Sequence, residues 1–447
     1  MTTVPASSPA ALSHAQRIPL AAEIHSRPFL RLEAPEAITH LAVYRASESG
    51  SRSSHGPGQH ALLVQLCEHF GVAAPHASAN HFYHDFGRFR LKWECHTEFA
   101  TYTVAAKIDA GLALPEAFAR VPLAHLPQSW MQALQGRLMA AVHVVLERGP
   151  ADPAALRDAF SGKTVVGARV MQGGELWTDF AIQADGFSRF VLRDVDMRGE
   201  QAARLVQRVL EIETYRMMAL LGLPAARAVG ASLDDIEAEL ATLAERMIGA
   251  DGIAPDQRGA HDTDDDQRLL AQITGLAARL ERLALANDYR FSASKAYQRI
   301  VAARIDELRE ARIEGMPTVG EFMDRRLSPA MSTCESTAAR KEALVRRVAN
   351  VNDLLRTRVS IVQEDQNRRI LQSMDRRAAQ QLRLQQAVEG LSVAAISYYV
   401  IGLLGYAGKA LKGLGLPLNP EVATGVLVPV VCGAVWLGLR RMHRRMH

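Results

Sequence analysis

Two apolar stretches near the end of the chain, LSVAAISYYVIGLLGYAG at residues 391–408 and VATGVLVPVVCGAVWLGL at residues 422–439, decide the expected fold. Neither stretch contains a charged side chain. At a helical rise of about 1.5 Å per residue, each covers nearly the ~30 Å hydrocarbon core of a bilayer. The short link between them contains Pro417 and Pro420 and requires an antiparallel pair. We therefore predict a C-terminal two-helix transmembrane hairpin over residues 390–439, with helices at 391–408 and 421–439.

Arginines lie before the first apolar stretch and after the second, but not in the link between them. The set comprises Arg368, Arg369, Arg376, Arg377 and Arg383 before the first stretch, and Arg440, Arg441, Arg444 and Arg445 in the basic tail at 440–447. The link offers only Lys409 and Lys412. The positive-inside rule therefore places both chain ends in the cytoplasm of a bacterial inner membrane. We expect the headgroups of the phospholipid membrane to attract Arg376, Arg377 and the four tail arginines.

The alternative is that the apolar hairpin forms the core of a large soluble protein, since both stretches are close to the minimum spanning length. Within the second stretch, Gly425, Pro429 and Gly433 recur every four residues. This spacing predicts a small-residue face on which another helix packs closely. Pro429 is equally compatible with a simple kink.

A long stalk helix is expected over residues 330–389, because proline is absent between Pro329 and Pro417 and glycine is absent until Gly390. Apolar residues at alternating steps of three and four predict a coiled-coil seam, interrupted at Gln366: Leu344, Val348, Val351, Leu355, Val359 and Val362, then Ile370, Met374 and Leu382. Its partner is either a neighbouring subunit or an upstream helix such as residues 289–313. Helical patterns at 200–221, 232–248 and 267–286 predict a helical bundle over residues 198–328.

Residues 18–197, after an N-terminus of 17 residues expected to be disordered, are predicted to form an α+β cytoplasmic domain. Residues 89–99 alternate apolar and polar side chains and predict one half-buried strand with a solvated polar face. Asp185-Gly186 favours a tight primed turn between strands at 177–183 and 187–195. Further strands are expected at 38–44, 142–146 and 164–171, and helices at 61–70 and 154–160.

Polar residues in this domain form the candidate site. A membrane-tethered enzyme or metal-binding domain would use Glu23, His25, Arg27, Lys92, Glu94 and His96 if these converge. His81, His84 and Asp85 are weaker metal candidates, since a strand would point the two histidines to opposite faces. The chain contains neither a phosphate-binding glycine loop, nor a dinucleotide fingerprint, nor a nucleophile elbow. The sequence thus identifies no catalytic residue and no cofactor.

Charge and cysteine content narrow the function classes. Lys plus Arg number 52 against 48 Asp plus Glu, a near balance that argues against general nucleic-acid binding. The four cysteines, Cys67, Cys95, Cys334 and Cys432, are scattered and predict neither a disulfide framework nor a thiolate zinc site. The first residues lack a basic start followed by an apolar run, so we expect no secretory signal.

Six short stretches carry a family resemblance: EIHSRPF at 23–29, the stretch 91–99 with LKWE followed by HTEF, DGFSRF at 185–190, EIETYR at 211–216, YRF at 289–291 and VEGLS at 388–392. Together they resemble the domain of unknown function 3422 family of bacterial membrane-anchored proteins, over nearly the whole chain after residue 18. This resemblance implies membrane anchoring and no particular activity.

The layout alone is similar to that of the CorA-type magnesium channels, which are homopentamers. Their first span ends in a Tyr-Gly-Met-Asn signature, whereas this chain reads GYAGK at 405–409. The Met-Asn pair is missing, and Lys409 would repel cations at a pore mouth. The likeness in layout is therefore a weak argument for ion transport.

Three functions remain as hypotheses. The first is a non-enzymatic, homo-oligomeric scaffold that binds a protein partner at the cytoplasmic face of the membrane. The second is a channel or transporter with Ser397, Tyr398 and Tyr406 as lining groups. The third is the membrane-tethered enzyme or metal-binding domain described above.

Overall fold

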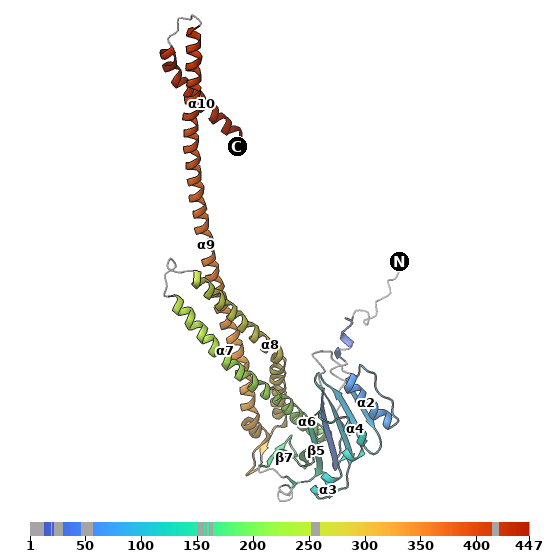
Figure 1. Ribbon diagram of the computed structural model, residues 1–447. Helices are drawn as coiled ribbons and strands as arrows, with labels where there is room; N and C mark the ends of the chain where they lie inside the picture. Colours follow the sequence, from blue (N-terminus) through green and yellow to red (C-terminus); the bar gives the residue numbers. More distant parts are fainter. Residues whose placement is uncertain are drawn as a thin grey trace, which may run out of the picture. The chain divides into compact units, whose positions relative to one another are not determined.

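The computed structural model describes residues 13–18, 20–21, 30–45, 57–149, 156, 159–160, 164–251, 260–413 and 420–446 (Figure 1). The chain divides into two compact units. One comprises Met1–Gly249 with Ile273–Ala349, and the other comprises Ala250–Gln272 with Asn350–His447. The first unit therefore combines the N-terminal α+β region with parts of the long helices.

A nine-stranded sheet organises the first unit, in the order β2-β3-β4-β1-β5-β8-β7-β6-β9. The pairings are antiparallel except for the parallel pair β5–β8. The strands are β1 (Glu36–Tyr44), β2 (His81–Asp85), β3 (Arg90–Cys95), β4 (Phe99–Lys107), β5 (Leu138–Arg148), β6 (Val166–Val170), β7 (Gly174–Ile182), β8 (Ser188–Asp194) and β9 (Ala311–Arg312). The α+β class of the N-terminal region is thus confirmed.

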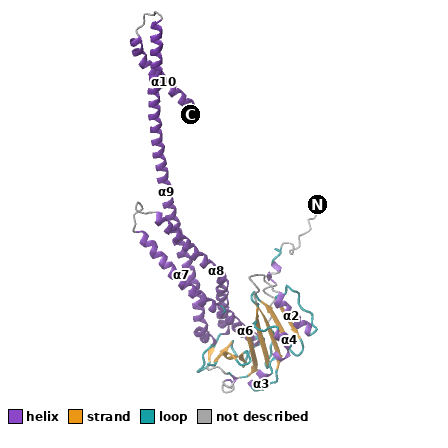
Figure 2. Cartoon of the chain, viewed as in Figure 1, coloured by secondary structure: helices purple, strands orange, loops and turns teal. Residues whose placement is uncertain are grey.

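Helices cover both faces of this sheet (Figure 2). On one face, Trp93 and Tyr102 are fully buried against Leu63 and Leu66 of α2 (Pro57–His69) and Trp130 of α4 (Gln128–Gln132). Further along that face, α3 (Leu114–Ala119) packs near the short 3-10 helix η2 (Pro122–His125). On the opposite face, α6 (Gln201–Leu220) places Met218 against Ala42, Phe99 and Ala140. Burial of each such large side chain contributes about 1.5–3 kcal/mol.

The expected single strand over residues 89–99 is wrong. β3 ends at Cys95, the chain reverses at Thr97 and Glu98, and the His96 N–H donates to the Phe99 carbonyl at 2.8 Å. Because the reversal pairs Phe99 with His96, Phe99 lies on the face of Lys92 instead of that of Leu91. The alternation of apolar and polar residues continued through the turn by coincidence.

The β7–β8 hairpin is present, but its turn is not the expected primed turn. Of the two residues in Asp185-Gly186, only Gly186 has a positive φ, at 85°. A type I′ turn requires positive φ at both central residues. Instead, Asp185 Oδ1 accepts a hydrogen bond from the Phe187 N–H at 3.0 Å and holds a wider turn.

Four long helices follow α6 in the chain: α7 (Gly222–Asp251), α8 (Ala260–Leu308), α9 (Val319–Gly413) and α10 (Pro420–Met446). α9 begins before Pro329 and continues through it. In the first unit, Leu344 and Val348 of α9 are buried. One turn earlier on α9, Arg340 donates to Glu237 of α7 at 2.5 Å. The next residue, Lys341, pairs with Asp288 of α8. Upstream helices of the same chain therefore cover this part of the seam.

The second unit contains the rest of the seam. Leu355 and Val359 are buried, and Arg358 donates to Asp266 of α8 at 3.0 Å. Farther along α9 the apolar side chains are open, with exposed fractions of 56% for Ile370, 60% for Met374 and 58% for Leu382. The predicted seam is thus buried as far as Val359 and exposed from Ile370 onward.

Among the described residues, α9 is the one helix whose length and composition are sufficient to cross a membrane. Its most apolar 18-residue window has a mean hydropathy of 1.7, and 6% of that window is buried. The apolar part of α10, Gly425–Gly438, is shorter than a span. A mixed α+β fold with one long apolar helix is therefore established, whereas a two-helix transmembrane hairpin is not.

Adjacent leucines on α9 provide a matched test of the seam. Leu355 is fully buried and Leu354 is 65% exposed. We expect Leu355→Ala to lower the free energy of unfolding by about 2–5 kcal/mol, because it leaves a cavity between helices. Leu354→Ala should change it by less than about 0.5 kcal/mol. Denaturant unfolding of the full chain in detergent measures both values, and equal effects would contradict the intramolecular seam.

Candidate functional site: a polar cavity between the sheet and α6

A cavity of about 210 Å³ lies in the first unit, between the sheet and α6. Its apolar lining includes Leu30, Leu32, Phe99, Val206 and Leu210. Its polar lining comes from three strands and two helices: His40, Lys92, Glu94, His96, Thr101, Thr103, Gln207, Glu211, Thr214, Tyr215 and Arg304. The fold thus gathers side chains that are up to 274 residues apart in sequence, from Leu30 to Arg304 (304 minus 30).

Strand register explains why the polar side chains meet. His40 of β1 lies opposite Thr103 of β4, which in turn lies opposite Lys92 of β3. Thr101 and Glu94 pair in the next row on the same face. Directly opposed residues project to the same side of a sheet, about 5 Å apart. The intervening residues, such as Leu91 and Trp93, enter the core on the other face.

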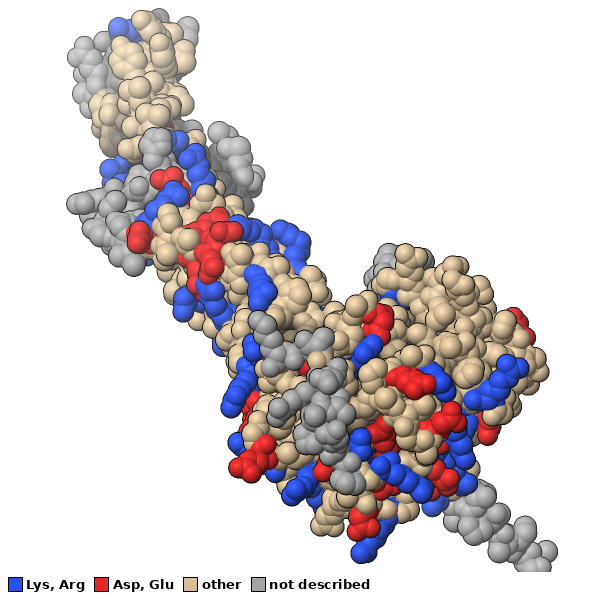
Figure 3. All heavy atoms as spheres, turned by 90° about the horizontal axis from the view of Figure 1, so that it is seen from below, with Lys and Arg blue, Asp and Glu red and all other residues tan. Residues whose placement is uncertain are grey.

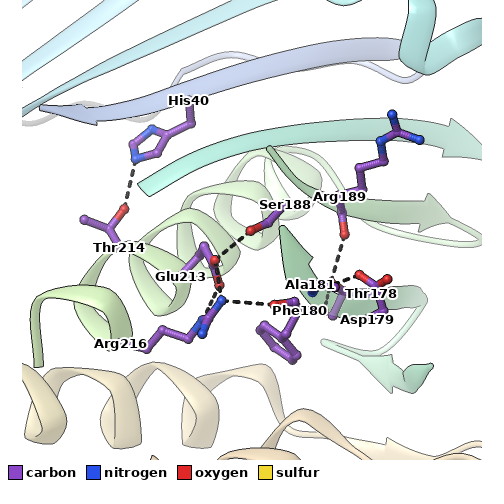
Figure 4. A network of polar contacts seen from close by, with 10 residues as sticks. All are labelled: His40, Thr178, Asp179, Phe180, Ala181, Ser188, Arg189, Glu213, Thr214 and Arg216. Carbon is purple, nitrogen blue, oxygen red and sulfur yellow. Dashed lines mark hydrogen bonds and ion pairs between the residues drawn. The ribbon is translucent and has the colours of Figure 1, made fainter. Parts of the chain in front are cut away.

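His40 joins the sheet to α6. Its Nδ1 lies 2.8 Å from Thr103 Oγ1, and its Nε2 lies 3.0 Å from Thr214 Oγ1 on α6 (Figure 4). Burial, followed by the electrostatic effect of the neighbouring Lys92 and His96, lowers the pKa of His40 to about 3. The ring is therefore neutral near pH 7, with one nitrogen donating and the other accepting. Both nitrogens are occupied, so His40 positions α6 and is not available as a general base.

Charged side chains around the cavity occur in opposite pairs. Lys92 Nζ lies 3.1 Å from Glu94 Oε2, and both side chains are largely buried. Across the cavity, Arg304 of α8 forms an ion pair with Glu211 of α6. Gln207 Nε2 also donates to Glu211 Oε1, at 2.7 Å. The lysine and the arginine of the lining are therefore each paired with a carboxylate.

A second polar network holds α6 against the other end of the sheet (Figure 4). Ser188 of β8 donates to Glu213 Oε1 at 3.0 Å, and Arg216 Nη2 donates to the same oxygen at 2.6 Å. Arg216 Nη2 also donates to the carbonyl of Phe180 at 3.3 Å. Phe180 lies at an irregularity in β7 with a φ of 50°. α6 is thus hydrogen-bonded to three strands, β1, β7 and β8.

Three of the six candidate polar residues, Lys92, Glu94 and His96, line one cavity. Their face of β3 is not solvated as expected, because α6 covers it and leaves Lys92 only 6% exposed. Glu23, His25 and Arg27 lie outside the described residues. The sequence reasoning missed other polar lining residues: His40, Thr103, Thr214, Glu211 and Arg304. Two signals were available: a histidine within the apolar strand pattern at 38–44, and the EIETYR motif at 211–216, which contains Glu211 and Thr214.

The weaker metal candidates lie on β2, an edge strand. His81 opposes Glu94, whereas His84 opposes Leu91, so the two histidines point to opposite faces. His84 packs edge-on against Phe86 at a centroid distance of 4.6 Å. Among the described residues, no three His, Cys, Asp or Glu side chains lie close enough together to hold a metal ion.

The candidate membrane contacts are only partly described. Gly425 and Pro429 are exposed on α10, and a methyl group added at Gly425 or Gly433 would meet no atom within 4 Å. Three of the six arginines assigned to the lipid surface are exposed: Arg376, Arg377 and Arg441. The structure does not describe the side chains of the other three, Arg440, Arg444 and Arg445. Tyr398 and Tyr406 are exposed on α9, whereas Ser397 is buried.

Acidic and basic side chains are interspersed over the face of the α+β region in Figure 3, without a field of one sign.

A family described as protein of unknown function (DUF3422) matches residues 12–446 of this sequence. The chain belongs to the DUF3422 family. The residues matched to DUF3422 include both the cavity lining and the apolar part of α9. Comparison with curated proteins gives no match.

The buried histidines predict a loss of stability in acid. Burial lowers the pKa of His143 to about 4 and that of His40 to about 3, from 6.5. Below pH 6.5 the unfolded chain binds protons that the folded chain does not. We therefore expect each histidine to lower the free energy of unfolding by about 2 kcal/mol between pH 6.5 and about pH 5.

Denaturant unfolding at the two pH values measures this effect. His40→Gln should flatten the pH dependence by about the share of one histidine. His76→Gln serves as the control, because His76 is exposed. An unchanged slope in the His40 variant would show that His40 is already charged in the folded protein.

Proposed function

We propose that this DUF3422 protein is a membrane-anchored binding protein whose cytoplasmic α+β region holds a small polar ligand between the sheet and α6. The observation that carries the proposal is the convergence of Lys92, Glu94 and His96 with Glu211 and Arg304 on one cavity. A polar lining with balanced charges and apolar walls is typical of a small-molecule site. The occupied nitrogens of His40 favour binding over acid–base catalysis.

Membrane anchoring rests on the exposed apolar part of α9. Leu391, Leu403 and Tyr406 are each more than two-thirds exposed on a helix that is long and apolar enough to span a bilayer. A soluble core helix would bury such side chains. We assign the arginines before this segment, including Arg376 and Arg377, to the cytoplasmic surface of the inner membrane.

Self-association through α9 is the second part of the proposal. Ile370, Met374 and Leu382 continue the seam beyond the point where α7 and α8 cover it. Exposed apolar residues at this spacing are expected to pack against the same face of another copy. The open small-residue positions Gly425 and Gly433 provide further room for a neighbouring helix.

Thermal unfolding of the detergent-solubilised full chain tests ligand binding. A panel of organic acids, amines, amino acids, sugars and nucleosides should contain at least one class that raises the Tm, because binding to the folded state stabilises it. Lys92→Met should abolish the shift. Lys107→Met is the control, since Lys107 is exposed on the same hairpin. Identical behaviour of both variants would argue against this cavity as the binding site.

Self-association is tested by the molar mass of the protein in detergent. Light scattering should show an oligomer for the wild-type chain and a monomer for the triple variant Ile370→Glu, Met374→Glu, Leu382→Glu, because like charges along the seam repel. Leu285→Glu on α8 is a control, since Leu285 is 74% exposed outside this seam. A monomeric wild-type protein would refute assembly.

A further inference from the structure

The charge balance of the cavity limits the net charge of its ligand. Lys92 and Arg304 are already neutralised by Glu94 and Glu211. A ligand with net charge would add an uncompensated charge to a partly enclosed site, which is unfavourable. An uncharged molecule and a zwitterion both satisfy this condition.

Unused donors on the two cations favour a ligand carboxylate. Arg304 uses Nε on Glu211 and Nη1 on Glu307, and its Nη2 has no acceptor among the described residues. Lys92 carries three N–H donors, and Glu94 is its carboxylate partner. A carboxylate entering the cavity would therefore find charge-assisted donors on both walls.

Carboxylate acceptors in the lining favour a ligand amine. Glu94 and Glu211 both line the cavity. Each carboxylate has lone pairs beyond those that bind Lys92, Gln207 and Arg304. An ammonium group would therefore find a charge-assisted acceptor beside each cation.

Apolar walls complete the description of the ligand. Leu30, Leu32, Val206, Leu210 and Phe99 line the same cavity. A volume of about 210 Å³ is below the ~300–1,000 Å³ of drug-sized pockets. The space therefore suits a metabolite with one short apolar group.

We infer that the cavity binds a small zwitterion with an apolar side chain, of the α-amino acid class. Within each ion pair, a donor and an acceptor lie side by side, which matches the adjacent carboxylate and ammonium groups of such a molecule. This inference rests on the proposed function, since it names the ligand of the same site.

Isothermal titration calorimetry of the full chain in detergent tests the class with leucine and two blocked derivatives. Leucinamide lacks the carboxylate, and N-acetylleucine lacks the ammonium. We expect leucine to bind and each derivative to bind at least about tenfold more weakly, because each leaves charged partners unused. Inorganic phosphate and glucose should give no heat of binding.

A matched pair of arginine variants locates the contact. Arg304→Gln should weaken leucine by at least about tenfold without weakening the cationic leucinamide, because Arg304 is the partner that we assign to the ligand carboxylate. Arg208→Gln should leave leucine binding unchanged, since Arg208 also bonds Glu307 but does not line the cavity.

The outcomes separate the two proposals. Equal binding of leucine and either derivative, or equal behaviour of the Arg304 and Arg208 variants, would overturn the zwitterion class. If phosphate or glucose binds instead and Lys92→Met abolishes that binding, the cavity remains the ligand site but its class is wrong. Absence of binding by every compound here and in the wider panel would overturn both proposals.

Discussion

The contact between α6 and the polar face of the sheet is the interaction on which the first unit depends. His40, held between Thr103 and Thr214, connects the helix to β1 and β4, and Glu213 and Arg216 connect it to β7 and β8. Buried polar groups require partners, so each of these side chains restricts where α6 can lie. The cavity exists because α6 is held over a face that apolar packing alone does not fill.

The remaining helices extend this arrangement along the chain. α8 contributes Arg304 to the cavity, and Arg290 of the same helix forms an ion pair with the buried Glu98 at the β3–β4 turn. Tyr297 donates to Glu98 at 2.8 Å. Burial of the Tyr297 hydroxyl, together with this hydrogen bond to a carboxylate, raises the pKa of Tyr297. α8 therefore contacts the α+β region at two places, the cavity and the β3–β4 turn. The same helix begins in the second unit, where Asp266 pairs with Arg358 of α9.

The two functions that we propose, ligand binding and membrane attachment, rest on different features: paired charges at the cavity and exposed apolar side chains on α9. At the cavity, Lys92 and Glu94 form a largely buried ion pair and Arg304 and Glu211 form a half-buried one, and such pairs add little to stability by themselves. Along α9 beyond Val359, apolar residues are open to their surroundings instead. Such a surface calls for lipid or another protein chain. The presence of both features in one chain agrees with the membrane-anchored binding protein that we propose.

The sequence by itself determined the elements with strong local patterns: the α+β class, the part of α9 that has no glycine from Ala330 until Gly390, and its uncharged apolar segment. It also singled out Lys92, Glu94 and His96 as unusual. Only the tertiary structure decided that β3 ends at Cys95, that α6 buries this polar face, and that Glu211 and Arg304 complete the cavity. Periodicity reports which side chains share a face of one element. It carries no information on which distant element will cover that face, because that choice depends on contacts between residues far apart in sequence.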